Sequence, residues 1–200
     1  MIIKTLVIGA IQENCYIVID EETMEAVILD PGGNGPEISK VADDLGAKVK
    51  YVLLTHGHFD HVGAVEYLAD KYKVPFYINE KDEDAIENDT TSVFGPLRKA
   101  DGHLSEGDTI SFGKTSAKVI TTPGHTPGGV CFLIEDKLFT GDTLFQGAVG
   151  RTDFPGGNFE DLISGIKTKL LILDDGVEVY PGHGGSSTIG YEKMRNPFLD

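Results

Sequence analysis

The chain has no tryptophan, only two cysteines and few basic residues, and these scarcities narrow the classes of function. Seventeen lysines and arginines stand against 32 aspartates and glutamates, a formal net charge of −15 at pH 7. A field of this sign repels phosphate backbones and anionic lipids, so we expect neither nucleic acid nor a membrane as a partner. Cys15 and Cys131 each lie in an apolar run without the charged, turn-borne setting that lowers a thiol pKa. We interpret both as reduced core residues and not as nucleophiles.

The N-terminus lacks the basic region, long apolar stretch and small-residue cleavage site of a secretory signal. Residues 1–7 instead predict a first β-strand of a cytoplasmic protein. A chain of 200 residues can bury about 70% of its unfolded surface, and no linker divides it. We therefore expect one domain over residues 1–200. The sequence leaves the oligomeric state open.

One short stretch, Thr-His-Gly-His-Phe-Asp-His-Val-Gly at 55–63, carries most of the chemical information. An apolar, β-branched run precedes it, and apolar residues at helical spacing follow it, so we place it on a loop between a strand and a helix. His56 and His58 can face one metal ion, while Asp60 and His61 can face a second ion beside it. The alternative interpretation is a solvated, histidine-rich turn.

Three later loops each place one possible metal ligand after a strand. They are Pro-Gly-His-Thr-Pro-Gly with His125, Gly-Asp-Thr with Asp142, and Pro-Gly-His-Gly with His183. A lone histidine at a strand end is usually a satisfied surface or core residue. Five of the six histidines fall in such loops, however, and this repetition favours a shared metal site over five separate structural roles.

Strands and helices alternate along the chain in two similar runs. This pattern predicts an α/β (α+β) protein, a four-layer αβ/βα sandwich with both sheets in the middle and helices on the outer faces. We expect the strand at 74–78 to be an edge strand because of its proline, the helix at 81–91 to be exposed, and 92–105 to be irregular. The other expected strands are 2–8, 15–20, 26–30, 49–54, 109–112, 117–122, 130–134, 138–140 and 177–180, and the other expected helices are 37–45, 62–72 and 159–170.

Together, the four loops from Thr55 to Gly184 resemble those of metallo-β-lactamase-fold hydrolases, in particular the short, single-domain glyoxalase II-like group, in type and order. The resemblance implies the same αβ/βα sandwich. It also implies two bound metal ions with one bridging carboxylate, Asp142. One ion would be held by His56, His58, His125 and Asp142, and the other by Asp60, His61, His183 and Asp142.

The chemistry of these side chains agrees with two divalent transition-metal ions. Imidazoles and carboxylates without thiolates suit Zn²⁺, our first expectation, and also Fe or Mn. Two adjacent ions can lower the pKa of a bound water to about 7, and Asp60 can orient the resulting metal-bound hydroxide as the catalytic carboxylate. A thiolate, with a free pKa of about 8.5, can leave without a general acid, so we expect a small-molecule acyl-thiol of the S-lactoylglutathione kind as substrate.

The segment Gly-Arg-Thr-Asp-Phe at 150–154 leaves an alternative open, because it also resembles persulfide dioxygenases. Those oxidoreductases use a single iron, bound by residues corresponding to His56, His125 and Asp142. A non-catalytic scaffold is a further alternative, but no expected ligand is missing. Arg151 can hold a substrate carboxylate or pair with Asp153, and we favour the pairing. The candidate substrate-binding residues by their place in the sequence are Arg151, Phe145 and Phe154.

Overall fold

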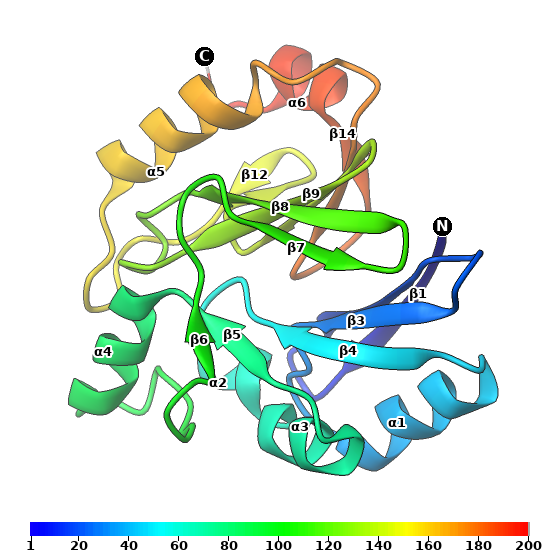
Figure 1. Cartoon of the computed structure of the whole chain (residues 1–200). Helices are drawn as coiled ribbons and strands as arrows, with labels where there is room; N and C mark the ends of the chain where they lie inside the picture. The colour runs from blue at the N-terminus through cyan, green and yellow to red at the C-terminus, as the bar shows by residue number, and fades with distance from the viewer. Residues whose placement is uncertain (200) are drawn as a thin grey trace.

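Two mixed β-sheets form the centre of the protein. In the computed structural model, which describes residues 1–199, they stack face to face with helices on their outer sides (Figure 1). The first sheet has the order β1-β2-β3-β4-β5-β6. Its strands are β1 (Ile2–Ile8), β2 (Glu13–Ile19), β3 (Glu25–Leu29), β4 (Lys48–Leu53), β5 (Phe76–Ile78) and β6 (Gly102–His103).

The second sheet has the order β14-β13-β10-β9-β8-β7, and β11 and β12 form a separate small ribbon. Strand β10 is parallel to β13 and antiparallel to β9, which is in turn antiparallel to β8. Strands β8, β10 and β13 therefore run in the same direction, and their C-terminal ends lie on the same side of the sheet. The strands are β7 (Thr109–Phe112), β8 (Thr115–Thr121), β9 (Val130–Ile134), β10 (Lys137–Gly141), β11 (Leu144–Phe145), β12 (Ala148–Val149), β13 (Glu178–Pro181) and β14 (Ser187–Thr188).

The helices divide between the two outer faces (Figure 1). Helices α1 and α3 cover the first sheet, and α5 and α6 cover the second, while α4 lies at one end of the sandwich. The bounds are α1 (Gly35–Asp44), α2 (Phe59–Val62), α3 (Val65–Tyr72), α4 (Glu80–Asn88), α5 (Phe159–Gly165), the π-helix η1 (Ile166–Leu170) and α6 (Ile189–Arg195). None of the helices in residues 1–199 is long and apolar enough to cross a membrane.

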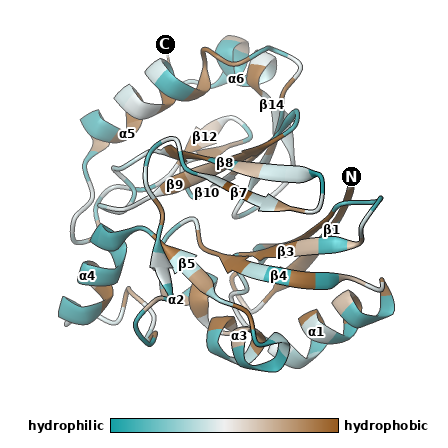
Figure 2. Cartoon of the chain, in the orientation of Figure 1, coloured by the Kyte–Doolittle hydropathy of each residue, from teal (hydrophilic) through white to brown (hydrophobic). Residues whose placement is uncertain are grey.

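Alternating side chains along the strands build three apolar layers. On β2, Ile17 packs with the cluster under α1 and α3, whereas the next residue, Val18, packs with the cluster between the sheets. Leu162 of α5 belongs to a third cluster, on the outer face of the second sheet. Figure 2 shows the hydrophobic colour concentrated on the strands. Each fully buried aliphatic side chain contributes about 1.5–3 kcal/mol to the stability of the fold, relative to an exposed one. The αβ/βα sandwich predicted from the sequence is confirmed.

Three expectations about single elements are wrong. Strand β5 is not an edge strand, because β6 pairs beyond it and Pro75 precedes the strand proper. Helix α4 is not simply exposed, since Asp82 and Glu83 in its first turn are buried. The stretch 92–105 is not wholly irregular, because it contains β6, which pairs with β5, and β14 adds a further strand after the one expected at 177–180. Strands of two residues such as β14 and β6 are too short to show a period in the sequence.

Candidate metal centre

The first loop begins where β4 ends, and a buried carboxylate holds its start. Asp30, just after β3, accepts hydrogen bonds from the Thr55 backbone N–H at 2.7 Å and from Thr55 Oγ1 at 2.6 Å. Because Oγ1 uses its proton on Asp30, it accepts a hydrogen bond from His56 Nδ1, 3.0 Å away. This contact fixes the His56 tautomer and leaves Nε2 free to bind a metal ion.

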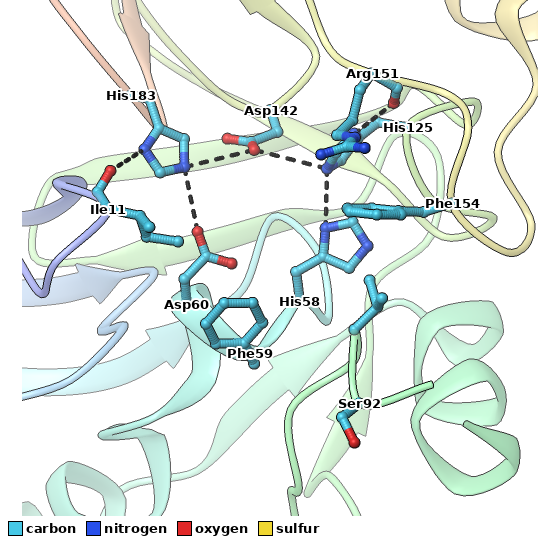
Figure 3. A pocket seen from close by; sticks show the side chains of 11 residues that line it. Ile11, His58, Phe59, Asp60, Ser92, His125, Asp142, Arg151, Phe154 and His183 are labelled. Carbon is cyan, nitrogen blue, oxygen red and sulfur yellow. Dashed lines mark hydrogen bonds and ion pairs between the residues drawn. The ribbon is translucent and has the colours of Figure 1, made fainter. Parts of the chain in front are cut away.

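His56, His58 and His125 form one cluster, in which their ligand atoms all lie within 4.8 Å of one another. His125 Nδ1 donates to the Arg151 backbone carbonyl at 2.8 Å, so its Nε2 points inward, 3.0 Å from His58 Nδ1 (Figure 3). All three rings are buried. These two nitrogens are close enough to share one proton in an N–H···N hydrogen bond, and the same spacing suits two ligands of one cation.

Asp60, His61 and His183 form a second cluster with the same 4.8 Å spread. Asp60 Oδ2 lies 3.2 Å from His183 Nε2 and 3.6 Å from His61 Nε2. The outer nitrogens have their own partners: His183 Nδ1 donates to the Ile11 carbonyl at 3.2 Å, and His61 Nδ1 lies 3.1 Å from Asp30 Oδ2. Both imidazoles therefore present Nε2 to the cluster.

Asp142 lies between the two clusters (Figure 3). Its Oδ1 is 3.5 Å from His61 Nε2, and its Oδ2 is 3.6 Å from both His125 Nε2 and His183 Nε2. A Cβ atom at Gly182 would lie 2.3 Å from Asp142 Oδ1, so the loop of His183 can approach the carboxylate only with glycine there. The geometry suits a carboxylate shared by two ions.

The two clusters differ in their electrostatics. In the first cluster, burial lowers the pKa of all three histidines, His56, His58 and His125, and that of His58 falls to about 3. These imidazoles are therefore neutral and can bind a cation. In the second, burial alone would lower the pKa of His61, but Asp142 and Asp30 outweigh it and raise the pKa. His183 has a raised pKa because it is hydrogen-bonded to Asp60. A cation entering the second cluster would displace these protons.

Unpartnered polar atoms test whether the residues fit metal ions. His56 Nε2, His61 Nε2 and Asp142 Oδ1 are buried and have no hydrogen-bond partner among residues 1–199. Buried polar atoms without partners are rare because each costs about 1–3 kcal/mol. Here they point into the two clusters, and bound cations would satisfy them. The seven residues predicted from the sequence therefore fit two divalent ions.

A pocket of about 330 Å³ opens on this centre (Figure 3). Two of the three predicted substrate residues, Arg151 and Phe154, line it, whereas Phe145 does not and instead faces His183 with ring centroids 6.4 Å apart. The remaining lining residues are Ile11, His58, Phe59, Asp60, Ser92, Val93, His125, Asp142 and His183. Apart from the candidate ligands, the wall is mostly apolar.

Arg151 forms the pairing that we favoured. Its Nε and Nη2 donate to the two carboxylate oxygens of Asp153, each at 2.7 Å, and its guanidinium carbon lies 3.7 Å from the centre of the Phe154 ring. The planar, two-pronged edge that would bind a substrate carboxylate is thus already occupied.

Sequence reasoning missed two buried acids beside the metal centre, Asp30 and Glu13. Asp30 supports both His56, through Thr55, and His61, and its place before a Pro-Gly-Gly turn at a strand end was a usable signal. Glu13 on β2 is buried, and its two carboxyl oxygens have no hydrogen-bond partner among the described residues. Burial raises the pKa of Glu13 to about 10, so the group is neutral at pH 7. Nothing in its sequence context marked Glu13.

Fold and site together define a class of protein. The sequence signature of the Metallo-beta-lactamase superfamily matches residues 8–183, and the chain belongs to this superfamily, a group of metallo-hydrolases whose fold binds divalent metals. Among individual relatives, the chain is 41% identical to the Haemophilus influenzae protein named hydroxyacylglutathione hydrolase GloC, over 100% of this chain and 99% of that protein.

Three solved structures share the fold over nearly the whole chain. BLEG-1, titled a B3 metallo-beta-lactamase, has a TM-score of 0.89 and 35% identity, with 99% of each chain covered. TTHA1623 in a di-iron-bound form has a TM-score of 0.87 and 35% identity, covering 98% of this chain and 100% of that one. ETHE1 from Myxococcus xanthus has a TM-score of 0.86 and 29% identity, covering 98% and 84%.

Proposed function

We propose that this chain is a hydroxyacylglutathione hydrolase-like thioesterase that works with two divalent metal ions. The observation that carries the proposal is the convergence of seven candidate ligand side chains on one centre. Five of them line a pocket that has no other acid among residues 1–199. One ion is assigned to His56, His58, His125 and Asp142, and the other to Asp60, His61, His183 and Asp142. The likeness to GloC supports the substrate class.

The residues of the pocket divide the chemical work. When bound, two divalent ions lower the pKa of a water between them and offset the negative charge that develops on the substrate carbonyl oxygen. Burial alone would raise the pKa of Asp60, but the hydrogen bond from His183 and the nearby His61 together outweigh it and lower the pKa, so the carboxylate is charged at neutral pH. Asp60 can therefore accept a hydrogen bond from the attacking water and aim it at the carbonyl.

The side chains that line the pocket limit which leaving groups the site can release. Every titratable side chain that lines the pocket within residues 1–199 is a candidate ligand, except Arg151, which is paired with Asp153. An amine leaving group needs a proton, whereas a thiolate with a free pKa of about 8.5 does not. This distinction favours a thioester over the amide of a β-lactam, although BLEG-1 is titled a metallo-beta-lactamase.

A mononuclear iron dioxygenase acting on a persulfide is the second candidate. The likeness to ETHE1 and the Gly-Arg-Thr-Asp-Phe segment support it. A single-iron site of this kind would use His56, His125 and Asp142 as ligands. It would give Asp60, His61 and His183 no role in binding metal. The 4.8 Å grouping of those three side chains therefore favours the two-ion hydrolase.

Metal analysis combined with a thiol-release assay tests the proposed function. We expect two transition-metal ions per chain and thiol release from S-lactoylglutathione that a chelator abolishes and added metal restores. One iron per chain with oxygen uptake on glutathione persulfide would identify the dioxygenase. Hydrolysis of a β-lactam without thiol release would identify a lactamase.

Selectivity among thiols should be loose, because the part of the chain that the structure describes offers the pocket no unpaired cation for the carboxylates of glutathione. Each charge-assisted hydrogen bond is worth about 1.5–3 kcal/mol, so its absence weakens binding and discrimination together. We expect kcat/KM values for glutathione, cysteine-based and coenzyme A thioesters to lie within about a thousandfold of each other. Asp153→Asn, which releases the two-pronged edge of Arg151, should lower KM for the glutathione ester. A larger preference in the unaltered protein would contradict this account.

A further inference from the structure

Helix α4 carries a carboxylate that the proposed chemistry does not use. Asp82 lies in the first turn of the helix and is 0% exposed, although the acidic sequence around it predicted a solvated helix. It does not line the pocket at the metal centre. A buried carboxylate costs several kcal/mol unless hydrogen bonds compensate it, so its partners show what it does.

Its two oxygens accept from two different loops. Asp82 Oδ2 accepts from the Gly57 backbone N–H at 2.9 Å, and Oδ1 accepts from the Gly128 backbone N–H at 2.6 Å. Gly57 stands between His56 and His58, and Gly128 stands three residues after His125. One carboxylate thus ties together the two loops that supply the first histidine cluster.

The surroundings hold this contact closely. A Cβ atom at Gly128 would lie 2.6 Å from the Asp82 backbone nitrogen, and one at Gly57 would lie 3.0 Å from Ile86 Cδ1. The backbone clash at Gly128 means that only glycine lets its loop approach α4 this closely, whereas the contact at Gly57 is tight but is with the end of a flexible side chain. The helix is itself anchored, since the Asn79 side chain caps its first turn and donates to the Leu104 carbonyl at 2.8 Å.

We propose that Asp82 is a positioning residue of the metal centre: it sets the distance between the His56–His58 loop and His125 and so the affinity for the first ion. The proposal rests on the two-ion site of the proposed function but not on the substrate. The second cluster does not depend on this contact, because Asp30 and the Ile11 carbonyl support its histidines. Asp82 should therefore affect one ion and not the other.

Asp82→Asn is the discriminating variant, because asparagine has one acceptor oxygen for two converging N–H donors and must turn its own NH₂ toward one of them. Co²⁺ titration against a chromophoric chelator measures the affinity. In a His183→Ala background, which weakens the second site, Asp82→Asn should weaken binding of the first ion by about 10- to 100-fold. In a His58→Ala background, it should change binding of the second ion less than about threefold.

Glu83→Gln is the matched control. Glu83 is the next residue of the same helix and is also buried, but its oxygens contact the Ala100 N–H at 2.6 Å and His103 Nε2 at 2.8 Å, away from both loops. This variant should leave both affinities unchanged. Equal losses in the two variants, equal losses at the two sites, or no loss in Asp82→Asn would overturn the proposal.

A measurement on the unaltered protein covers the case in which Asp82→Asn does not fold. By NMR, the Gly57 and Gly128 amide protons of the metal-free protein should resist hydrogen exchange although both lie in loops. Rapid exchange of either amide would refute the contact. None of these readouts uses a thioester, so a wrong substrate assignment leaves the test of Asp82 intact.

Discussion

Replacing Asp142 by alanine should cost more activity than replacing any other candidate ligand. Its two oxygens lie 3.5–3.6 Å from histidines of both clusters, so the change removes a ligand from each ion. Loss of a residue that merely supports a metal ligand typically lowers activity by about 10- to 100-fold. We expect the rate of thiol release to fall further than this in Asp142→Ala. Metal analysis of the same sample should show both ions depleted.

His61→Ala provides the comparison for this prediction. His61 is fully buried, and on the proposed assignment its Nε2 binds only the second ion, together with Asp60, His183 and Asp142. We expect this variant to lose mainly one ion and to keep more activity than Asp142→Ala. Equal metal content and equal rates in the two variants would mean that Asp142 does not bridge.

Asp60→Asn should lower kcat by about 10²–10⁴-fold with little change in KM, the range expected when a group that accepts a proton or hydrogen bond in the reaction is removed. Asparagine keeps an oxygen that can bind the second ion, but it lacks the negative charge that the lowered pKa gives Asp60 at neutral pH. Steady-state kinetics at matched metal content measures the effect. A kcat within tenfold of the unaltered protein, with two ions bound, would remove Asp60 from the mechanism.

The architecture and the candidate ligands were predictable from the sequence for one physical reason. Buried strands have a clear period, and a metal ligand must follow a strand closely if a rigid sheet is to position it. His125, Asp142 and His183 each follow such a strand, and the structure brings them together with the first loop. The short strands β6 and β14 carry no period and were missed.

Contacts between distant loops were not predictable in the same way. The charges of α4 indicated a solvated helix, yet Asp82 is buried because backbone amides of Gly57 and Gly128 compensate it, and amides leave no trace in a residue pattern. The residues of the pocket wall could not be predicted from the sequence for a similar reason. Ile11 and Phe59 look like ordinary apolar residues in the sequence, and only the fold places them beside the ligands.

The two-sheet origin of the ligands has a thermodynamic consequence. His56, His58, Asp60 and His61 follow β4 of the first sheet, whereas His125, Asp142 and His183 follow strands of the second. On the proposed assignment each ion is therefore a cross-link between the halves of the sandwich. An ion that binds only the folded chain adds about 4.1 kcal/mol of stability when its free concentration is a thousand times its Kd. Metal supply would then govern not only the rate of catalysis but how long the two halves stay docked.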